Sequence, residues 1–353
     1  MRLFLASPHT ITRFNNGYQL LCESILQGKT VLTESSHLYT GGGTNMIVFL
    51  AGGVSGNLKP AWQRTAKRPD ISLKAFTEEL ANENFWRGGE SRHWIQDETS
   101  PMKNKNENIS GRRSTVERRG GYDPIIREHR PYILESFYYA DEDTERLLPL
   151  FGDFLLDSGA FTFMSDSRSH CDWDEYIERY AAFIRRNDIQ KFFELDIDSV
   201  VGYPKVKEYR RKLENLTGKQ CIPVWHKSRG IEEWKKMADE YSYIAIGGIV
   251  SKEIKPEQYK AFPTMISEAH KRKAKVHGLG FTNLTLLPKI HFDSVDSTAW
   301  TTGNRFGFIY KFNGKTMIKK DCPKGKRLGD PRKVALINYT EWIKYQKYAE
   351  IYL

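Results

Sequence analysis

The feature that most constrains the fold is an alternation of short β-rich runs with amphipathic helical stretches, which begins near residue 130. This alternation is typical of a parallel sheet wrapped by helices. The candidate strands are residues 46–53, 132–140, 154–159, 191–198, 221–226, 243–250, 274–280 and 292–297. Eight strands joined by helices predict an α/β fold of the TIM (β/α)8 barrel type, although an open doubly wound sheet would give a similar local pattern.

Several helices between these strands show a 3.6-residue periodicity. In residues 172–188 the apolar side chains share one face, and Asp172 stands where an N-cap is expected. Further helices are predicted from Ile231, over residues 256–273, and from about Asp330 to the end.

We expect a single catalytic barrel domain over residues 1–353, because this length suffices for a full barrel with insertions. Residues 86–122 are polar and rich in Gly, Asn and Arg, which predicts a basic mobile insertion. Residues 313–333 form a second basic segment before the last helix. The net charge of +10 favours a polyanionic partner such as nucleic acid. Residues 86–122 could contact a phosphate backbone or form a solvated loop.

Nothing in the sequence indicates a membrane or an oxidising compartment. No apolar run is long enough to cross a bilayer, and the start MRLFLASPHT lacks a basic region followed by a sustained apolar stretch. The four cysteines stand far apart, without a CxxC pair. We therefore expect a cytoplasmic protein, or one of the host cytoplasm if a phage encodes it.

Aspartates end three of the predicted strands. They are Asp157, Asp196 with Asp198, and Asp296. Barrel enzymes assemble their active sites at this edge, and a carboxylate that follows a buried strand is costly unless it is paired or used. Any single one could instead cap the next helix, but the four together predict a catalytic site.

Glycines accompany these aspartates at two strand ends. Gly247-Gly248 and Gly278-Leu279-Gly280 both follow apolar strands. Backbone without side chains lets a planar ligand approach closely, although tight strand-to-helix turns would require the same glycines.

Four short motifs resemble those of the tRNA-guanine transglycosylase superfamily. In chain order they are Asp157-Ser158-Gly159-Ala160-Phe161, Ile246-Gly247-Gly248-Ile249-Val250, His277-Gly278-Leu279-Gly280 and Asp293-Ser294-Val295-Asp296-Ser297. The resemblance covers roughly residues 130–310, and four motifs in the family's order are more specific than any one alone.

The resemblance implies a role for each matched residue. It makes Asp296 the nucleophile and Asp157 the partner acid/base. The residues implied or considered as contacts to the substrate base are Ser158, Phe161, Asp196, its alternate Asp198, His226, Gly247, Gly248, His277 and Gly278.

Four of the candidate site residues could instead have a purely structural role. His226 could line the pocket or be satisfied by loop backbone, and His277, where the family has Met, could read the base edge. Trp300 could stack on a neighbouring base or pack against the barrel, and Arg305 could hold a phosphate or remain a surface arginine.

Two departures from the family indicate a different polynucleotide. The structural zinc motif is absent, since Cys322 is the only cysteine after Asp296, and the stretch after that nucleophile differs from the tRNA enzymes. The chain thereby resembles the phage and bacterial branch that inserts 7-deazaguanine into DNA. The implied partners are DNA, with tRNA as the alternative, a free 7-deazaguanine base such as 7-cyano-7-deazaguanine (preQ0), and possible accessory modification proteins. No metal and no organic cofactor are implied.

Carboxylates from two strands also suit this chemistry without the family. Base exchange at C1′ with retention needs a carboxylate that forms a glycosyl-enzyme and a second group that moves protons. A glycoside hydrolase or nucleosidase would use a similar pair. A non-catalytic nucleic-acid-binding barrel is the rival from another class, and the presence of both Asp157 and Asp296 argues against it.

Overall fold

The computed structural model describes residues 45–54, 58–76, 130–160, 171–324, 328–329 and 331–353. The predicted insertion at 86–122 and the predicted base contact Phe161 lie outside these ranges.

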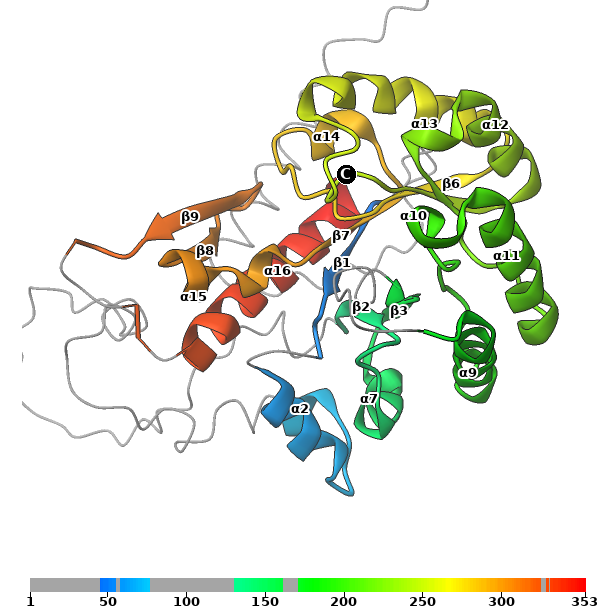
Figure 1. Ribbon diagram of the computed structural model, residues 1–353. Helices are drawn as coiled ribbons and strands as arrows, with labels where there is room; N and C mark the ends of the chain where they lie inside the picture. The colour runs from blue at the N-terminus through cyan, green and yellow to red at the C-terminus, as the bar shows by residue number, and fades with distance from the viewer. Residues whose placement is uncertain (1–44, 55–57, 77–129, 161–170, 325–327, 330) are drawn as a thin grey trace, which may run out of the picture.

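Seven of the eight predicted strands form one sheet in which every neighbouring pair is parallel (Figure 1). The strand order is β3-β2-β1-β7-β6-β5-β4, so the first and last of these strands are neighbours and the sheet curls. The strands are β1 (Ile47–Ala51), β2 (Tyr132–Ser136), β3 (Asp153–Asp157), β4 (Val224–Trp225), β5 (Tyr243–Ile246), β6 (Lys275–Gly278) and β7 (Ser294–Ser297). This is an α/β fold with a curled parallel sheet of the TIM-barrel kind.

The eighth predicted strand, residues 191–198, is reduced to two isolated parallel bridges. Phe192 pairs with Leu156 at the end of β3, and Phe193 pairs with Ile222 just before β4. The extended conformation ends there because the Glu194 carboxylate, rather than a backbone carbonyl, accepts the Val224 N–H at 2.8 Å. Residues after Glu194 turn away into a helix, so Asp196 and Asp198 do not share the face of a strand as predicted.

Both faces of the sheet are buried, as expected for parallel strands with apolar sequences. One cluster of alternate side chains fills the inside of the curl: Phe49, Ala51, Leu134, Leu155, Phe193, Ile222, Val224 and Ala245. The intervening residues, such as Val48, Ile133 and Val295, belong to the larger cluster formed with the outer helices.

The helices of the described residues are labelled in Figure 1. They are α2 (Lys59–Ala66), α7 (Glu142–Leu147), α9 (Trp173–Arg186), α10 (Asp198–Val201), α11 (Tyr203–Thr217), α12 (Ile231–Glu240), α13 (Phe262–Lys271), α14 (Leu287–Ile290), α15 (Gly303–Phe306) and α16 (Pro331–Tyr352).

The periodic helices agree with the sequence, with one exception. Asp172 caps α9 and accepts hydrogen bonds from the backbone of Asp174 and Glu175 at 3.0 and 3.1 Å. The helix predicted over 256–273 is divided into the 3-10 helix η4 (Pro256–Ala261) and α13. Pro263 explains the division, because proline lacks an N–H and fits the first turn of a new helix.

The C-terminal region packs against the sheet through α16, which runs beside β1 (Figure 1). The buried amide of Gln346 donates to the carbonyls of Val48 and Tyr132, at 2.7 Å each. The basic segment 313–333 contains a strand the sequence analysis missed: β9 (Met317–Asp321) pairs antiparallel with β8 (Phe308–Phe312). Within the described ranges, no helix has the length and apolarity needed to span a membrane.

Candidate active site

A pocket of about 1020 Å³ opens at the carboxyl edge of the curled sheet. Residues at or after the ends of all seven strands contribute to its wall, among them Gly52, Ser136, Asp157, His226, Gly248, Leu279 and Asp296. The predicted site residues that line it are Asp157, Ser158, Asp196, Asp198, His226, Gly248 and Asp296. A pocket of this size can enclose a nucleoside with part of its flanking backbone.

Asp296 ends the apolar part of β7 and is 6% exposed. Its Oδ1 accepts the backbone N–H of Gly280 at 2.6 Å and lies 3.2 Å from His277 Nε2. Within the described part of the chain, both of these contacts fall on Oδ1. The second carboxylate oxygen is therefore the one available to a ligand.

His277 is not among the residues that line the pocket. The side chain is fully buried, with Nδ1 2.6 Å from Ser294 Oγ and Nε2 directed at Asp296. The imidazole on β6 therefore contacts two residues of β7, Ser294 and Asp296.

Asp157 ends β3, and its Oδ2 accepts the Gly159 N–H at 3.1 Å. The pKa of this carboxyl is raised to about 6, mainly by burial; the Gly159 and Ser158 N–H groups lower it in part, and the nearby charges of Asp196 and Asp296 add to the rise. Gly159 has φ of +75°, and a Cβ there would lie 2.6 Å from Ser136 Oγ, so the turn that presents Asp157 requires glycine.

Ser158 follows Asp157 and is 1% exposed, yet it contributes to the pocket wall. Its carbonyl accepts the hydroxyl of Tyr176 on α9 at 2.5 Å. This bond ties the Asp157 turn to the helical layer.

His226 lies between two carboxylates in the pocket. Nε2 is 2.6 Å from Asp196 Oδ1, and Nδ1 is 2.9 Å from Glu253 Oε2. Burial lowers the pKa of His226, but the hydrogen bonds and charge of the two carboxylates outweigh burial and raise it to about 9. The imidazole is therefore a cation at neutral pH, and it fixes the orientation of Asp196.

Asp198 begins α10 and is held by Arg229 rather than by a ligand. Arg229 Nε donates to Asp198 Oδ1 at 2.9 Å, and its Nη1 donates to the fully buried Glu194 at 2.9 Å. Glu194 also accepts Arg210 Nε at 2.6 Å, and the Arg229 guanidinium lies 4.2 Å from the centre of the Tyr203 ring. Asp198 thus belongs to a buried ion-pair network beneath the pocket, although it still contributes to the wall.

Among the described residues, one group of potential ligands lies close enough to hold a metal ion. Ligand atoms of Asp196, Asp198 and His226 lie within 4.8 Å of one another. Arg229 already donates a hydrogen bond to each carboxylate oxygen of Asp198, and both ring nitrogens of His226 face carboxylates. These contacts would have to be broken for a cation to bind.

The predicted glycines differ in where they lie relative to the pocket. Gly247 donates its N–H to Trp225 at 2.9 Å, and a Cβ there would lie 2.6 Å from Val224 Cγ1 and 3.0 Å from the His226 ring. A Cβ on Gly278 would lie 2.9 Å from Phe292 in the outer core. Neither is in the pocket wall. Gly248, with φ of +75°, does line the pocket.

The two residues assigned to nucleic acid differ in exposure. Trp300 is 1% exposed and donates its indole N–H to the Ala51 carbonyl at 3.0 Å. It packs against Tyr339 of α16, with ring centroids 5.4 Å apart, so stacking on a base is wrong and packing against the barrel is correct. Arg305 is exposed on α15, and its role in holding a phosphate stays a prediction.

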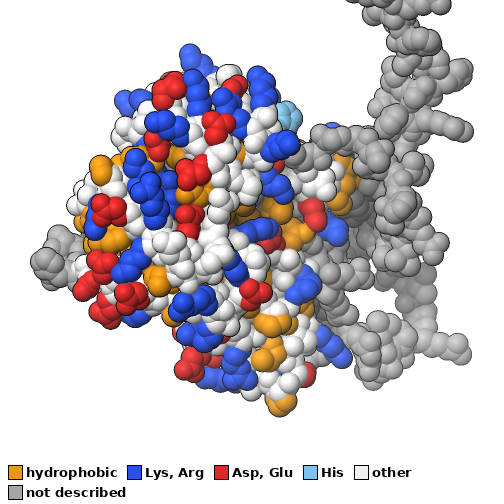
Figure 2. Space-filling view, turned by 90° about the vertical axis from the view of Figure 1, so that its right-hand side faces the viewer, with side chains coloured by type: hydrophobic (Ala, Val, Ile, Leu, Met, Phe, Trp, Pro, Cys, Tyr) orange, Lys and Arg blue, Asp and Glu red, His pale blue; other side chains and the backbone are white. Residues whose placement is uncertain are grey.

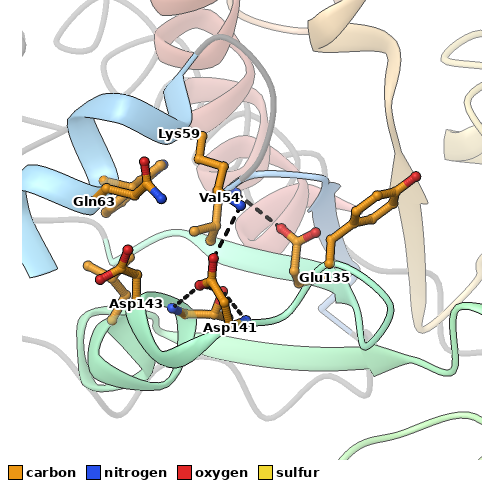
Figure 3. A pocket seen from close by; sticks show the side chains of 10 residues that line it. Val54, Lys59, Gln63, Glu135, Asp141 and Asp143 are labelled. Atoms are coloured by element: carbon orange, nitrogen blue, oxygen red, sulfur yellow. Dashed lines mark hydrogen bonds and ion pairs between the residues drawn. The ribbon is translucent and has the colours of Figure 1, made fainter. Parts of the chain in front are cut away.

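Glu135 is a buried carboxyl group that the sequence analysis missed. It is 2% exposed, and Figure 3 shows it turned toward the Val54 N–H, at 3.3 Å. It lines the main pocket and also a second pocket, which α2 and α7 border and which at about 10 Å³ has room for at most one water molecule. Burial raises the pKa of Glu135 to about 7, because the hydrogen bonds from the Val54 and Ser136 backbone compensate only in part.

Several other residues that hydrogen-bond within the site were not predicted: Glu194, Arg229, Glu253, Gly280 and Ser294. For Arg229 and Glu253 the only signal was a charged residue shortly after a strand end, which is common on surfaces. Gly280 lies in one of the quoted motifs, and its positive φ of +70° directs a backbone N–H at Asp296.

The outer helices on one side carry no single-sign patch. On the face seen in Figure 2, Lys and Arg side chains stand among Asp and Glu side chains. Lys212 of α11, for example, pairs with Asp174 and Glu178 of α9 at 2.7 and 3.1 Å. A polyanion would therefore find little net attraction there.

Comparison with known proteins identifies no family for this chain. No protein-family model matches the chain, and no curated protein matches it. Solved structures that match include the carboxyl transferase domain of Rhizobium etli pyruvate carboxylase with 3-bromopyruvate, at 11% identity and a TM-score of 0.36, over 64% of this chain and 42% of that chain. The same domain with 3-hydroxypyruvate matches at 11% identity and a TM-score of 0.33, over 59% and 37%. The chain spans less than half the length of these solved structures.

Proposed function

We propose that this protein is a DNA-guanine transglycosylase, which exchanges guanine in DNA for a free 7-deazaguanine base through a covalent intermediate on Asp296. One observation carries the proposal: Asp157 and Asp296, from strands β3 and β7, face one pocket in contrasting environments. Carboxyl groups held in different environments in one site are typical of acid and nucleophile pairs.

The proposal includes a closed (β/α)8 barrel as the scaffold. Residues 191–194 would act as its eighth strand between β3 and β4, supported by the bridges at Phe192 and Phe193. Closure would fix the positions of Asp157 and Asp196 relative to Asp296, since their segments then lie on one continuous rim.

In the first half of the reaction, the free oxygen of Asp296 attacks C1′ and the bond from C1′ to the guanine nitrogen breaks. The bonding electrons leave with the base, which takes a proton from Asp157. In the second half, the incoming base gives its N–H proton to Asp157 and its nitrogen attacks C1′, which releases the Asp296 carboxylate. A carboxyl with a pKa of about 6 can serve in both protonation states near neutral pH.

Asp196, oriented by His226, would accept the N–H groups on the polar edge of the purine, and Gly248 would lie against the base. Both line the pocket, and Gly248 has no side chain to block it. Guanine must leave the base stack to enter, because C1′ is out of reach of a side chain inside a duplex.

The choice of DNA over tRNA rests on the resemblance to the branch without the zinc motif, whereas the net charge of +10 suits either nucleic acid. A free base such as 7-cyano-7-deazaguanine would be the second substrate, and accessory modification proteins would be further partners. Exchange on tRNA remains the alternative, and the contrast of carboxylates is equally suited to it.

Exchange of radiolabelled guanine, measured with purified full-length protein on DNA and on bulk tRNA side by side, tests the proposal. We expect label to move into DNA, and incorporation of 7-cyano-7-deazaguanine into the same DNA. Movement in tRNA alone would replace DNA by tRNA as substrate. Base release without incorporation would indicate a hydrolase instead.

A further inference from the structure

A buried chain of polar groups leads from the inside of the sheet to Asp296. The Tyr243 hydroxyl on β5 hydrogen-bonds to Ser294 Oγ on β7. Ser294 Oγ lies 2.6 Å from His277 Nδ1, and His277 Nε2 lies 3.2 Å from Asp296 Oδ1. His277 is fully buried and Ser294 is 1% exposed, so these groups depend on one another for hydrogen bonds.

One arrangement of protons gives every hydroxyl proton and both ring nitrogens a partner. Tyr243 donates to Ser294, Ser294 donates to His277 Nδ1, and His277 Nε2–H donates to the Asp296 carboxylate. Burial raises the pKa of Tyr243, which keeps its hydroxyl protonated as the first donor. In this arrangement Ser294 sets the position of the ring proton on Nε2.

We propose that His277 is a positioning residue that orients the Asp296 carboxylate and promotes its release from the covalent intermediate. This inference rests on the function proposed above. His277 and the Gly280 N–H both donate to Oδ1, so the other oxygen forms the bond to C1′. In the resulting ester Oδ1 is the carbonyl oxygen.

The two donors act mainly in the second half of the reaction. When the incoming base attacks C1′, the bond from C1′ to Asp296 breaks and its electron pair returns to the carboxylate. Negative charge then grows on Oδ1, where the two N–H groups already point. Loss of the His277 donor therefore makes Asp296 a poorer leaving group, while its first attack is not slowed.

His277→Met removes the donor and keeps a side chain of similar size, whereas His277→Gln retains an N–H. In rapid-quench reactions with DNA, we expect breakdown of the covalent adduct to slow by about 10- to 100-fold in His277→Met, with adduct accumulation. His277→Gln should recover part of the rate, and Ser294→Ala should show a smaller slowing. Unfolding midpoints of the three variants identify any loss of the fold.

Nuclear magnetic resonance of ¹⁵N-histidine in the full chain gives a readout independent of turnover. The signal lost in His277→Gln should show a proton on Nε2 and none on Nδ1, and Ser294→Ala should shift it. An adduct that forms and breaks down at the wild-type rate in His277→Met would overturn the inference and leave the transglycosylase proposal standing. Wild-type protein with neither exchange nor adduct would overturn both.

Discussion

An aspartate lines the pocket on the β3 side and another on the β7 side, and the surroundings of the two carboxyl groups differ. On β7, Asp296 accepts the Gly280 N–H and faces the His277 ring with one oxygen. On β3, Asp157 accepts one backbone N–H, and burial with two neighbouring carboxylates raises its pKa to about 6. If the proposed function is correct, the environment, rather than residue type, separates the nucleophile from the group that carries the proton.

Asp296→Asn should have the largest effect, because it removes the atom that bonds to C1′. We expect base exchange to fall by on the order of 10⁴-fold or more, with DNA affinity unchanged. Exchange kinetics and a binding titration measure the two quantities. Asp239→Asn, at an exposed ion pair with Arg272, is the matched control and should keep wild-type exchange. Substantial exchange by Asp296→Asn would remove the distinction between the two sides.

Asp157→Asn should lower exchange by about 10²- to 10⁴-fold, as expected when a general acid/base is lost. In the wild type, adduct formation should decline as pH rises through about 6, since Asp157 must be protonated to release guanine. The variant should lack this decline. Asp153→Asn, at the other end of β3, serves as the control. An unchanged pH profile in Asp157→Asn would assign the proton to another group.

Arg229→Met tests the ion-pair network beneath the β3 side. The variant removes the buried cation that pairs with Asp198, and it leaves Arg210 as the cation that pairs with Glu194. The free energy of unfolding should therefore fall by about 3–5 kcal/mol. Denaturant titration measures it. Arg272→Met breaks surface pairs with Asp239 and Glu268 and should cost about 1 kcal/mol or less. Equal losses in the two variants would contradict a special role for the buried network.

Glu135→Gln concerns stability rather than turnover. The folded-state pKa of about 7 lies above the ordinary 4.5, so the folded protein binds the extra proton between these values and loses stability as pH rises through them. Relative to the variant, the wild type should lose about 3 kcal/mol between pH 4.5 and 8. Unfolding titrations across that range measure it, with the exposed Glu257→Gln as control. Parallel pH curves for the wild type and Glu135→Gln would show that this carboxyl is not perturbed.

The sequence predicted most of the sheet because buried parallel strands are nearly continuous apolar runs with acidic or glycine-rich ends. It predicted that Asp157, Asp196 and Asp296 would meet, since the carboxyl ends of parallel strands share one edge. The side-chain orientations of His277 and Trp300 and the close packing around Gly247 could not be predicted in this way. Each depends on which side of the backbone a residue faces and on long-range partners such as Ser294, Val224 and Ala51.

Trapping the covalent intermediate tests the transglycosylase proposal most directly. Full-length protein is mixed with guanine-containing DNA, denatured during turnover and digested, and the modified peptide is found by mass spectrometry. We predict a deoxyribosyl adduct on Asp296 that disappears when a free 7-deazaguanine base is added and the reaction is chased. An adduct on Asp157, or exchange that proceeds with no adduct on any carboxylate, would contradict the assignment of Asp296 as the nucleophile.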